Sequence, residues 1–312
     1  MEILRSILSE PFFVILLGGT LTASIPIILA AIGESLVEKG GVLNLGLEGE
    51  MLIGAFVAFV IALNTRNLFW GLFSGIAAGL LVALAFGYLV IYLKVNQIVA
   101  GLGIWIFGIG ITSLLFRVFF GRRFPIARGI TSKTAIPYLS QIPYIRSVFN
   151  QHIVAYVALA LIPLAWWLLY KTNFGLHIRA VGENPVAADA HGVNVYRTRY
   201  LTVMLEGILA GLAGAFLSIC DLSFFVDNMT LGRGFIAIGI VMLANWNPSR
   251  IFYGAFLFGV FYSLTSGLQI AGVNVPREFL LMLPYVAVIV VLCIFARNTR
   301  LPAAFCLPYE RE

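Results

Sequence analysis

The chain has 312 residues, of which 61% are hydrophobic and 11% charged, and its formal net charge is +6. Soluble globular domains carry roughly 25% charged residues, so this composition excludes a soluble protein and predicts a polytopic membrane protein. Two of the three cysteines, Cys220 and Cys293, fall in apolar segments, and the third, Cys306, has no partner at a suitable spacing. The sequence therefore predicts neither a disulfide framework nor a metal site.

Apolar segments of roughly 20 residues, the length that crosses a bilayer, follow one another along the whole chain. We place them at about 11–32, 45–63, 68–93, 97–119, 151–170, 200–220, 232–246, 251–270 and 278–296. Because lipid offers no partner to open backbone groups, each segment is predicted to be a helix. We expect one all-α membrane domain over residues 1–312, with about nine transmembrane helices (eight to ten).

A polar stretch, GLHIRAVGENPVAADAHG, interrupts this pattern at 175–192. Asn184 is a favourable helix N-cap, Pro185 suits the first helical position, and Gly192 suits the residue after the last one. Between them lie about two turns with small alanines on one face. The pattern predicts a short helix on which a soluble partner docks; the alternative is an ordinary capped helix in a loop.

The charged loops give conflicting signals about orientation. The loop at 117–150 has six basic residues and no acid, whereas the loop at 171–199 has four basic and two acidic residues. One span separates them, so they lie on opposite sides of the membrane. A count of basic residues places 117–150 in the cytoplasm. We instead place 171–199 there, because a docking helix needs a cytoplasmic partner, and this puts the N-terminus outside.

Two segments resemble each other: LGLEGEMLIGAFVAFV at 45–60 and LGRGFIAIGIVMLA at 231–244. Each follows a turn that contains asparagine, and each precedes a polar connection and another span. In the adopted orientation the first begins inside and the second outside, which is the pattern of an inverted repeat in transporters. Glycine-rich apolar segments also resemble each other by chance, so both interpretations stay open.

Acidic residues inside spans are costly and therefore candidates for function. Glu48 and Glu50 begin the second span after Asn44, and Glu206 lies about seven residues into the sixth. We assign Asn44, Glu48 and Glu206 to a candidate translocation path. Alternatively, Glu48 and Glu50 lie at the interface beside a helix N-terminus, and Glu206 is hydrogen-bonded, paired or protonated.

Four further residues join the candidate path. Asn96 and Gln97 open the fourth span, where their amides either bind a sugar or a base or cap the helix. Phe224 and Phe225 either form an aromatic gate or belong to the interfacial aromatic belt. No phosphate-binding Gly-x4-Gly-Lys-Ser/Thr motif and no His-Glu-x-x-His motif occurs in the chain, which argues against ATP hydrolysis or metalloprotease chemistry on this chain.

Three motifs carry a family resemblance. GGVLNLGLEGEMLIGAF (40–56), LKVNQIVAGL (93–102) and IRAVGENPVAADAHGVNV (178–195) resemble the permease family of bacterial ABC importers for ribose, nucleosides and branched-chain amino acids. The resemblance covers about residues 20–297, and EKGGVLNLGLEG is similar to the nucleoside and simple-sugar branch. The family usually has a small or neutral residue in place of Glu206, so this chain departs from it there.

The resemblance implies a multi-pass subunit of the bacterial plasma membrane that has no catalytic site and no cofactor. It implies several partners: a cytoplasmic ABC ATPase, a second and different permease chain, an extracytoplasmic binding protein, a small-molecule substrate and membrane lipid, but no nucleic acid polymer. The ATPase would bind the cytoplasmic coupling loop at 171–199 through Arg179, Gly182, Glu183, Asn184, Pro185, Ala187, Ala188 and Gly192. The binding protein would contact Arg128 and Arg233.

Two alternatives to a nucleoside or sugar importer remain. One is a branched-chain amino-acid ABC permease. The other is an ion-coupled secondary transporter in which Glu206 or Glu48 carries a proton or sodium.

Overall fold

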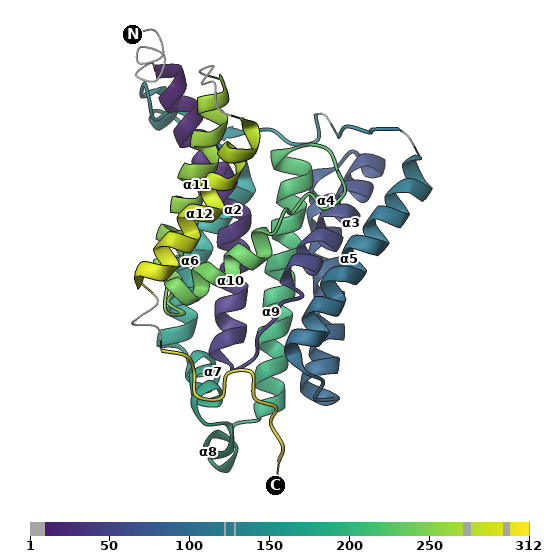
Figure 1. The fold of residues 1–312 in the computed structure, drawn as a ribbon, viewed down its shortest axis with the longest axis vertical. Coiled ribbons are helices and arrows are strands. Elements are labelled where there is room, and N and C mark those ends of the chain that lie inside the picture. Colours follow the sequence, from purple (N-terminus) through teal and green to yellow (C-terminus); the bar gives the residue numbers. More distant parts are fainter. Residues whose placement is uncertain (1–9, 122, 128, 271–275, 296–299, 312) are drawn as a thin grey trace.

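The computed structural model describes residues 10–121, 123–127, 129–270, 276–295 and 300–311. Long helices stand side by side in it as an elongated bundle (Figure 1). The helices are α2 (Glu10–Lys39), α3 (Leu47–Thr65), α4 (Leu68–Gly87), α5 (Gln97–Phe120), α6 (Ile153–Lys171), α7 (Asn173–Glu183), α8 (Pro185–Ala190), α9 (Val195–Ala215), α10 (Arg233–Leu243), α11 (Pro248–Ile270) and α12 (Arg277–Phe295). Short π-helical segments, Tyr88–Tyr92 and Phe216–Asp221, extend α4 and α9.

Seven helices in the described part of the chain are long and apolar enough to cross a membrane. The structure therefore does not confirm the expected number of nine spans. The largest difference is the seventh predicted span, where α10 has only 11 residues and rises about 16 Å, roughly half of a bilayer core. Turns set its limits, because Leu231 and Gly232 before it and Asn245 and Trp246 after it all have positive φ angles.

The first predicted span also differs from the structure. It was expected to end near residue 32, but α2 continues to Lys39. Two glutamates, Glu34 and Glu38, lie in this extra part and are fully buried. Two acidic residues so close together are typical of a loop in a membrane protein. The span predicted from the sequence therefore stopped before them.

The centre of the bundle is formed by α2, α3, α4 and α9. Glycines allow α4 and α9 to approach each other with their backbones almost in contact: a Cβ on Gly211 would lie 2.2 Å from the carbonyl oxygen of Gly75, and one on Gly79 would lie 2.4 Å from that of Gly207. Small residues at helix contacts in membranes favour such close packing. Gly75, Gly79, Gly207 and Gly211 thus serve close packing of α4 on α9.

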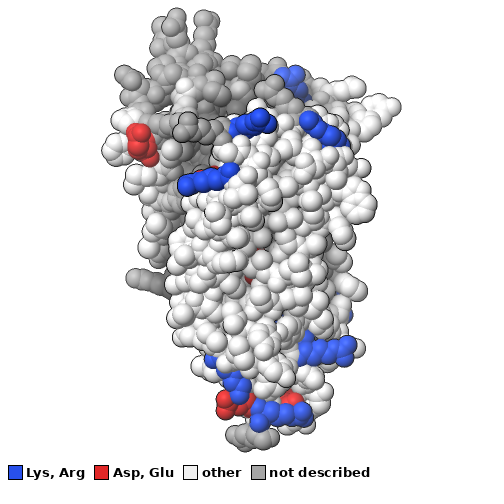
Figure 2. All heavy atoms as spheres, turned by 90° about the vertical axis from the view of Figure 1, so that its right-hand side faces the viewer, with Lys and Arg blue, Asp and Glu red and all other residues white. Residues whose placement is uncertain are grey.

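The two ends of the bundle carry most of the charge. One end holds α7, α8 and the C-terminal residues 300–311 and is called the α8 end (Figure 1). The other holds the long connection between α5 and α6, in which β1 (Thr134–Ala135) pairs with β2 (Asn150–Gln151), and is called the hairpin end. The face in Figure 2 has Lys and Arg at both ends and an almost uncharged band between them. The loops at 117–150 and 171–199 thus lie at opposite ends, as expected.

Candidate functional site

Asn44 is the centre of a buried polar network that joins three helices. Its side-chain Nδ2 donates to Glu50 Oε1 at 2.8 Å and to Glu206 Oε1 and Oε2 at 3.0 and 2.9 Å. Its backbone N–H donates to Glu34 Oε1 at 3.1 Å, and its Oδ1 accepts from the N–H of Gly46 at 2.8 Å. One asparagine therefore ties α2, α3 and α9 together through their carboxyl groups.

The network continues towards the α8 end through Glu38. The Nε1–H of Trp246 donates to Glu38 Oε2, and the Nζ of Lys39 lies 5.5 Å from the centre of the Trp246 ring. Sequence reasoning missed Glu34, Glu38 and Trp246. The spacing of Glu34 and Glu38, one helical turn apart on an apolar helix, was the available signal, but their partners lie elsewhere in the sequence.

The carboxyl groups of this network lack a cationic partner. Among the described residues, the two ion pairs within 4.0 Å are Lys94–Glu310 and Arg311–Asp189, and both lie at the α8 end. An isolated buried carboxylate is very costly, so hydrogen bonds such as those from Asn44 must offset its burial. The network is thus a hydrogen-bonded clamp that joins α2, α3 and α9 inside the bundle.

Glu48 has a separate role at the start of the short helix α10. Its Oε1 accepts from the N–H of Gly232 at 2.7 Å, and its Oε2 accepts from the N–H of Gly234 at 2.6 Å. A carboxylate at a helix N-terminus satisfies open N–H groups and complements the helix dipole. Gly234 permits this contact, since a Cβ there would lie 2.8 Å from the backbone of Glu48. The two similar segments at 45–60 and 231–244 thus meet at this point.

The two amides of the fourth span have structural partners. Asn96 caps α5, because its Oδ1 accepts from the N–H groups of Ile98 and Val99 at 3.0 and 3.2 Å. Gln97 is buried, and its Oε1 accepts from the N–H of Leu43 at 2.8 Å. Gln97 thereby holds the turn that places Asn44 in its network.

The aromatic and basic candidates occupy different surroundings. Phe225 is 1% exposed and packs against Phe56, with ring centroids 5.2 Å apart, so it belongs to the core. Phe224 packs against Phe124 at 5.3 Å. Arg233, a candidate contact of the binding protein, is 3% exposed and lies over the ring of Tyr262 at 5.2 Å. Arg128 lies outside the described residues.

An aromatic contact between α5 and α10 was not predicted. Trp105 and Phe235 pack edge to face with ring centroids 5.1 Å apart. Phe235 also lines a cavity of about 370 Å³ together with Gly232, Ile236, Gly239, Tyr285, Val288 and Ile289. This apolar cavity lies where α10 is too short to fill the thickness of the membrane.

The short helix predicted between Asn184 and Gly192 is confirmed by α8, which spans Pro185–Ala190. The Oδ1 of Asn184 accepts from the N–H of Ala187 at 3.0 Å, Pro185 occupies the first turn, and Gly192 has a φ of +84°. Helix α7 precedes it and places Gly182 against the end of α2. A Cβ on Gly182 would lie 1.9 Å from the carbonyl oxygen of Lys39, so only glycine permits this contact.

The remaining coupling-loop residues fall into two groups. Glu183, Asn184, Ala187 and Gly192 are exposed, and so is Val186 at 58%. Ala188 is 6% exposed and packs with Val181, Val195 and Tyr309. Arg179 lies against the ring of Tyr170 at 5.4 Å. The methyl group of Ala188 is thus covered by the chain itself, and the open face of α8 contains Val186 and Ala187 instead.

The C-terminal residues cross the α8 end and hold this loop in place. The N–H of Ala304 donates to the carbonyl of Gly182 at 2.9 Å, and the N–H of Cys306 donates to that of Gly41 at 3.1 Å. Arg199 donates to the carbonyl of Leu307 at 3.0 Å. Two ion pairs, Lys94–Glu310 and Arg311–Asp189, flank these contacts. The tail therefore connects α2, α7, α8 and α9 with the turn before α5.

Comparisons with known proteins agree with this architecture. The putative glucose ABC transporter permease protein TsgC13 of Haloferax volcanii is 38% identical, over 95% of this chain and 98% of its own. The nucleoside ABC transporter permease protein NupC of Lactococcus lactis is 35% identical, over 96% and 97%. The guanosine ABC transporter permease protein NupQ of Bacillus subtilis is 33% identical, over 95% and 96%.

Each of these three organisms also has a second, more distant relative with a permease name. These are 26% identical in Haloferax volcanii, 23% in Lactococcus lactis and 25% in Bacillus subtilis. Residues 16–292 match the family described as "Branched-chain amino acid transport system / permease component". The match begins within α2 and ends within α12. The chain is therefore a multi-pass membrane protein that belongs to this family of transport permeases.

Proposed function

We propose that this chain is the membrane subunit of an ATP-driven importer for a nucleoside or a simple sugar. The observation that carries the proposal is α8, a capped helix that projects from the bundle at one end and leaves Val186 and Ala187 exposed. A secondary transporter has no use for such a helix, whereas a permease driven by a separate ATPase needs one. The names of the relatives at 33–38% identity agree with this function.

The α8 end would face the cytoplasm and the hairpin end the outside. A cytoplasmic ABC ATPase would grip the exposed face of α8, and the loop at 171–199 would transmit its movement within a single membrane domain. Contact between Gly182 and the end of α2, together with the tail, links this loop to the bundle. A force on α8 would therefore reach α2 and α9, the helices that share the Asn44 network.

A solute path is favoured along α10, which packs on α12 and touches α5 through the contact of Phe235 with Trp105. Helix α10 is short there, and Phe235 and Tyr285 line an open cavity. The acidic groups nearby are engaged in hydrogen bonds, Glu48 with α10 and Glu206 with Asn44. Because these acidic groups are already hydrogen-bonded, the path is better suited to a neutral solute than to a zwitterionic amino acid. The aromatic rings would stack on such a neutral solute.

The remaining partners follow from the same comparisons. Pairs of unlike relatives within one organism support an assembly with a second, different permease chain. An extracytoplasmic binding protein would deliver the solute to the hairpin end of the plasma membrane assembly.

Uptake into proteoliposomes tests the proposal. The chain is reconstituted with its ATPase and permease partners, and uptake of guanosine, uridine, glucose and leucine is measured with binding protein outside and ATP inside. We expect concentrative, ATP-dependent uptake of a nucleoside or of glucose that a protonophore leaves unchanged. Uptake that needs no ATP and collapses with the protonophore would contradict the proposal, and uptake of leucine alone would contradict the solute class.

The role of α8 is tested by copurification of the ATPase. Val186→Asp places a charge on the exposed face of α8 and should abolish copurification. Tyr138→Asp is the matched control, because Tyr138 is also exposed but belongs to the hairpin end. Equal copurification with both variants would show that α8 does not bind the ATPase.

A further inference from the structure

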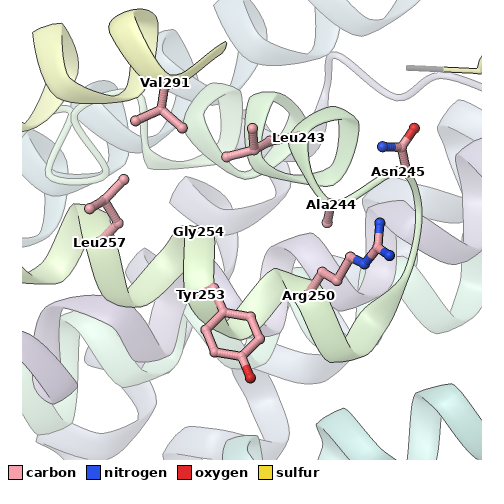
Figure 3. Close-up of a pocket in the computed structure, with 8 residues that line it drawn as sticks. All are labelled: Leu243, Ala244, Asn245, Arg250, Tyr253, Gly254, Leu257 and Val291. Carbon is pink, nitrogen blue, oxygen red and sulfur yellow. The ribbon is translucent and has the colours of Figure 1, made fainter. Parts of the chain in front are cut away.

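A cavity of about 630 Å³ lies between the end of α10, the first half of α11 and the last part of α12. Its lining consists of Leu243, Ala244, Asn245, Arg250, Tyr253, Gly254, Leu257 and Val291 (Figure 3). None of these residues takes part in the Asn44 network, the Glu48 contact or the coupling loop. Tyr253 is strongly exposed at the rim, so the cavity opens to the surroundings of the bundle.

The two halves of this cavity differ in chemistry. Asn245 and Arg250 lie together on one side, Leu257 and Val291 lie on the other, and Leu243 lies between the two groups (Figure 3). Among the described residues, no carboxylate lies within 4.0 Å of the Arg250 guanidinium group. The polar end therefore offers an uncompensated positive charge, and the apolar end offers a surface suited to hydrocarbon.

The polar half lies next to the C-terminal end of α2, the end of that helix that leads to the α8 end. Trp246 follows Asn245 directly, bonds to Glu38 and lies beside Lys39, the last residue of α2. The Oδ1 of Asn245 accepts from the backbone N–H of Arg300 at 3.3 Å, so the start of the tail passes this mouth. From here α11 runs back into the apolar part of the bundle and carries Gly254 and Leu257 with it.

We infer that this cavity is a binding site for an anionic phospholipid of the adjacent leaflet. The phosphate would lie at Arg250, whose planar guanidinium group suits bidentate contact with phosphate oxygens. One acyl chain would fill the space between Leu243, Leu257 and Val291. Basic pockets between helices at the membrane boundary bind acidic headgroups by this combination, and a soluble anion would leave the apolar half exposed.

A photoactivatable phosphatidylglycerol tests the site on the complete chain in nanodiscs, with a phosphatidylcholine probe of the same acyl chains for comparison. Peptide mapping should locate the phosphatidylglycerol label on α10, α11 or α12. Arg250→Gln should lower this labelling about fivefold, the effect of one basic residue near the surface on an anionic lipid, and lower phosphatidylcholine labelling less, because the choline cation offsets the phosphate charge of that lipid. Lys171→Gln is the matched control, because Lys171 is also exposed at the α8 end of a span but is remote from the cavity.

A second variant tests the apolar half. Val291→Trp would fill part of the cavity and lower the labelling by both lipids while keeping the charge of Arg250. Equal labelling by the two lipids in the unchanged chain, or equal effects of Arg250→Gln and Lys171→Gln, would overturn the inference. So would a disulfide between Tyr253→Cys and the second permease chain in the assembled complex, because a protein would then occupy the site.

Discussion

The side-chain amide of Asn44 donates to both carboxyl oxygens of Glu206, although 162 residues separate the two in sequence. This contact fixes the turn after α2 against the middle of α9. It also explains why an acid is tolerated at a position inside a span. Glu206 is a member of a clamp that includes Glu34 and Glu50, which favours the structural interpretation of this residue over a charged translocation path.

The clamp predicts different results for two substitutions of Glu206. Glu206→Gln keeps the shape and an acceptor for Asn44, so it should retain substantial ATP-dependent uptake. Glu206→Leu leaves the Asn44 amide buried without this partner, and it should lower the free energy of unfolding by about 1–3 kcal/mol. Thermal unfolding in detergent and uptake in vesicles measure the two effects. Loss of concentrative uptake in Glu206→Gln with unchanged stability would indicate an ion-coupled role instead.

The contact of Glu48 with α10 predicts a local change in backbone dynamics. Glu48→Ala removes the acceptor for the N–H groups of Gly232 and Gly234. The amide exchange of residues 232–236 should then become faster, while exchange in α9 stays the same. Hydrogen–deuterium exchange with mass spectrometry measures both segments. Unchanged protection at 232–236 would show that Glu48 does not hold the start of this helix.

Local signals in the sequence predicted α8, whereas the polar network needed the structure. Asn184, Pro185 and Gly192 fix the limits of a short helix within nine residues. Glu38 is held by Trp246, 208 positions away, and no local pattern connects the two. The length of α10 was missed for another reason, since apolar residues continue through its terminal turns. The turns that end α10 have positive φ angles at non-glycine residues such as Leu231 and Asn245, and such turns are hard to recognise from the residue types alone.

Acidification should destabilise the hairpin end through His152. Burial, together with the positive charge of Lys133, holds the pKa of His152 below its usual value of 6.5, and its Nδ1 lies 2.8 Å from the Oγ1 of Thr131. The unfolded chain therefore takes up a proton before the folded one. The stability that neutral His152 contributes is complete above pH 6.5 and is lost as the pH falls below it.

Thermal unfolding at pH 7.5, 6.5 and 5.5 measures this effect. The unchanged chain should lose more stability between pH 6.5 and 5.5 than His152→Gln does. Parallel pH profiles for the two chains would refute the assignment to His152.

Cysteine labelling tests the orientation. Ser132 and Val186 are both exposed. Ser132 belongs to the connection between α5 and α6 at the hairpin end, and Val186 belongs to α8. In a background without the native cysteines, Ser132→Cys should react with a membrane-impermeant maleimide added outside intact cells, and Val186→Cys only after permeabilisation. The reverse pattern would mean that the count of basic residues gives the correct orientation and that α8 is external.

The position of Ala188 under Tyr309 predicts a clear difference between two faces of α8. Ala188 packs against Tyr309 and Val195, whereas Val186 is open. A tryptophan at position 188 has no room and would displace the tail, at a cost of about 1–3 kcal/mol for overpacking. Ala188→Trp should therefore expose the chain after Arg300 to limited proteolysis, while Val186→Trp should leave the tail protected.

Uptake and ATPase binding then separate the packing role from the docking role. Tyr309→Ala removes the packing of the tail on Ala188 without a substitution in α8, and it should reproduce the proteolysis of Ala188→Trp and weaken the coupling of ATP hydrolysis to uptake. Val186→Trp should lower ATPase copurification although its tail stays in place. If Ala188→Trp kept the tail protected and still lost the ATPase, Ala188 would contact the partner directly, and the tail would not be its cover in the assembled transporter.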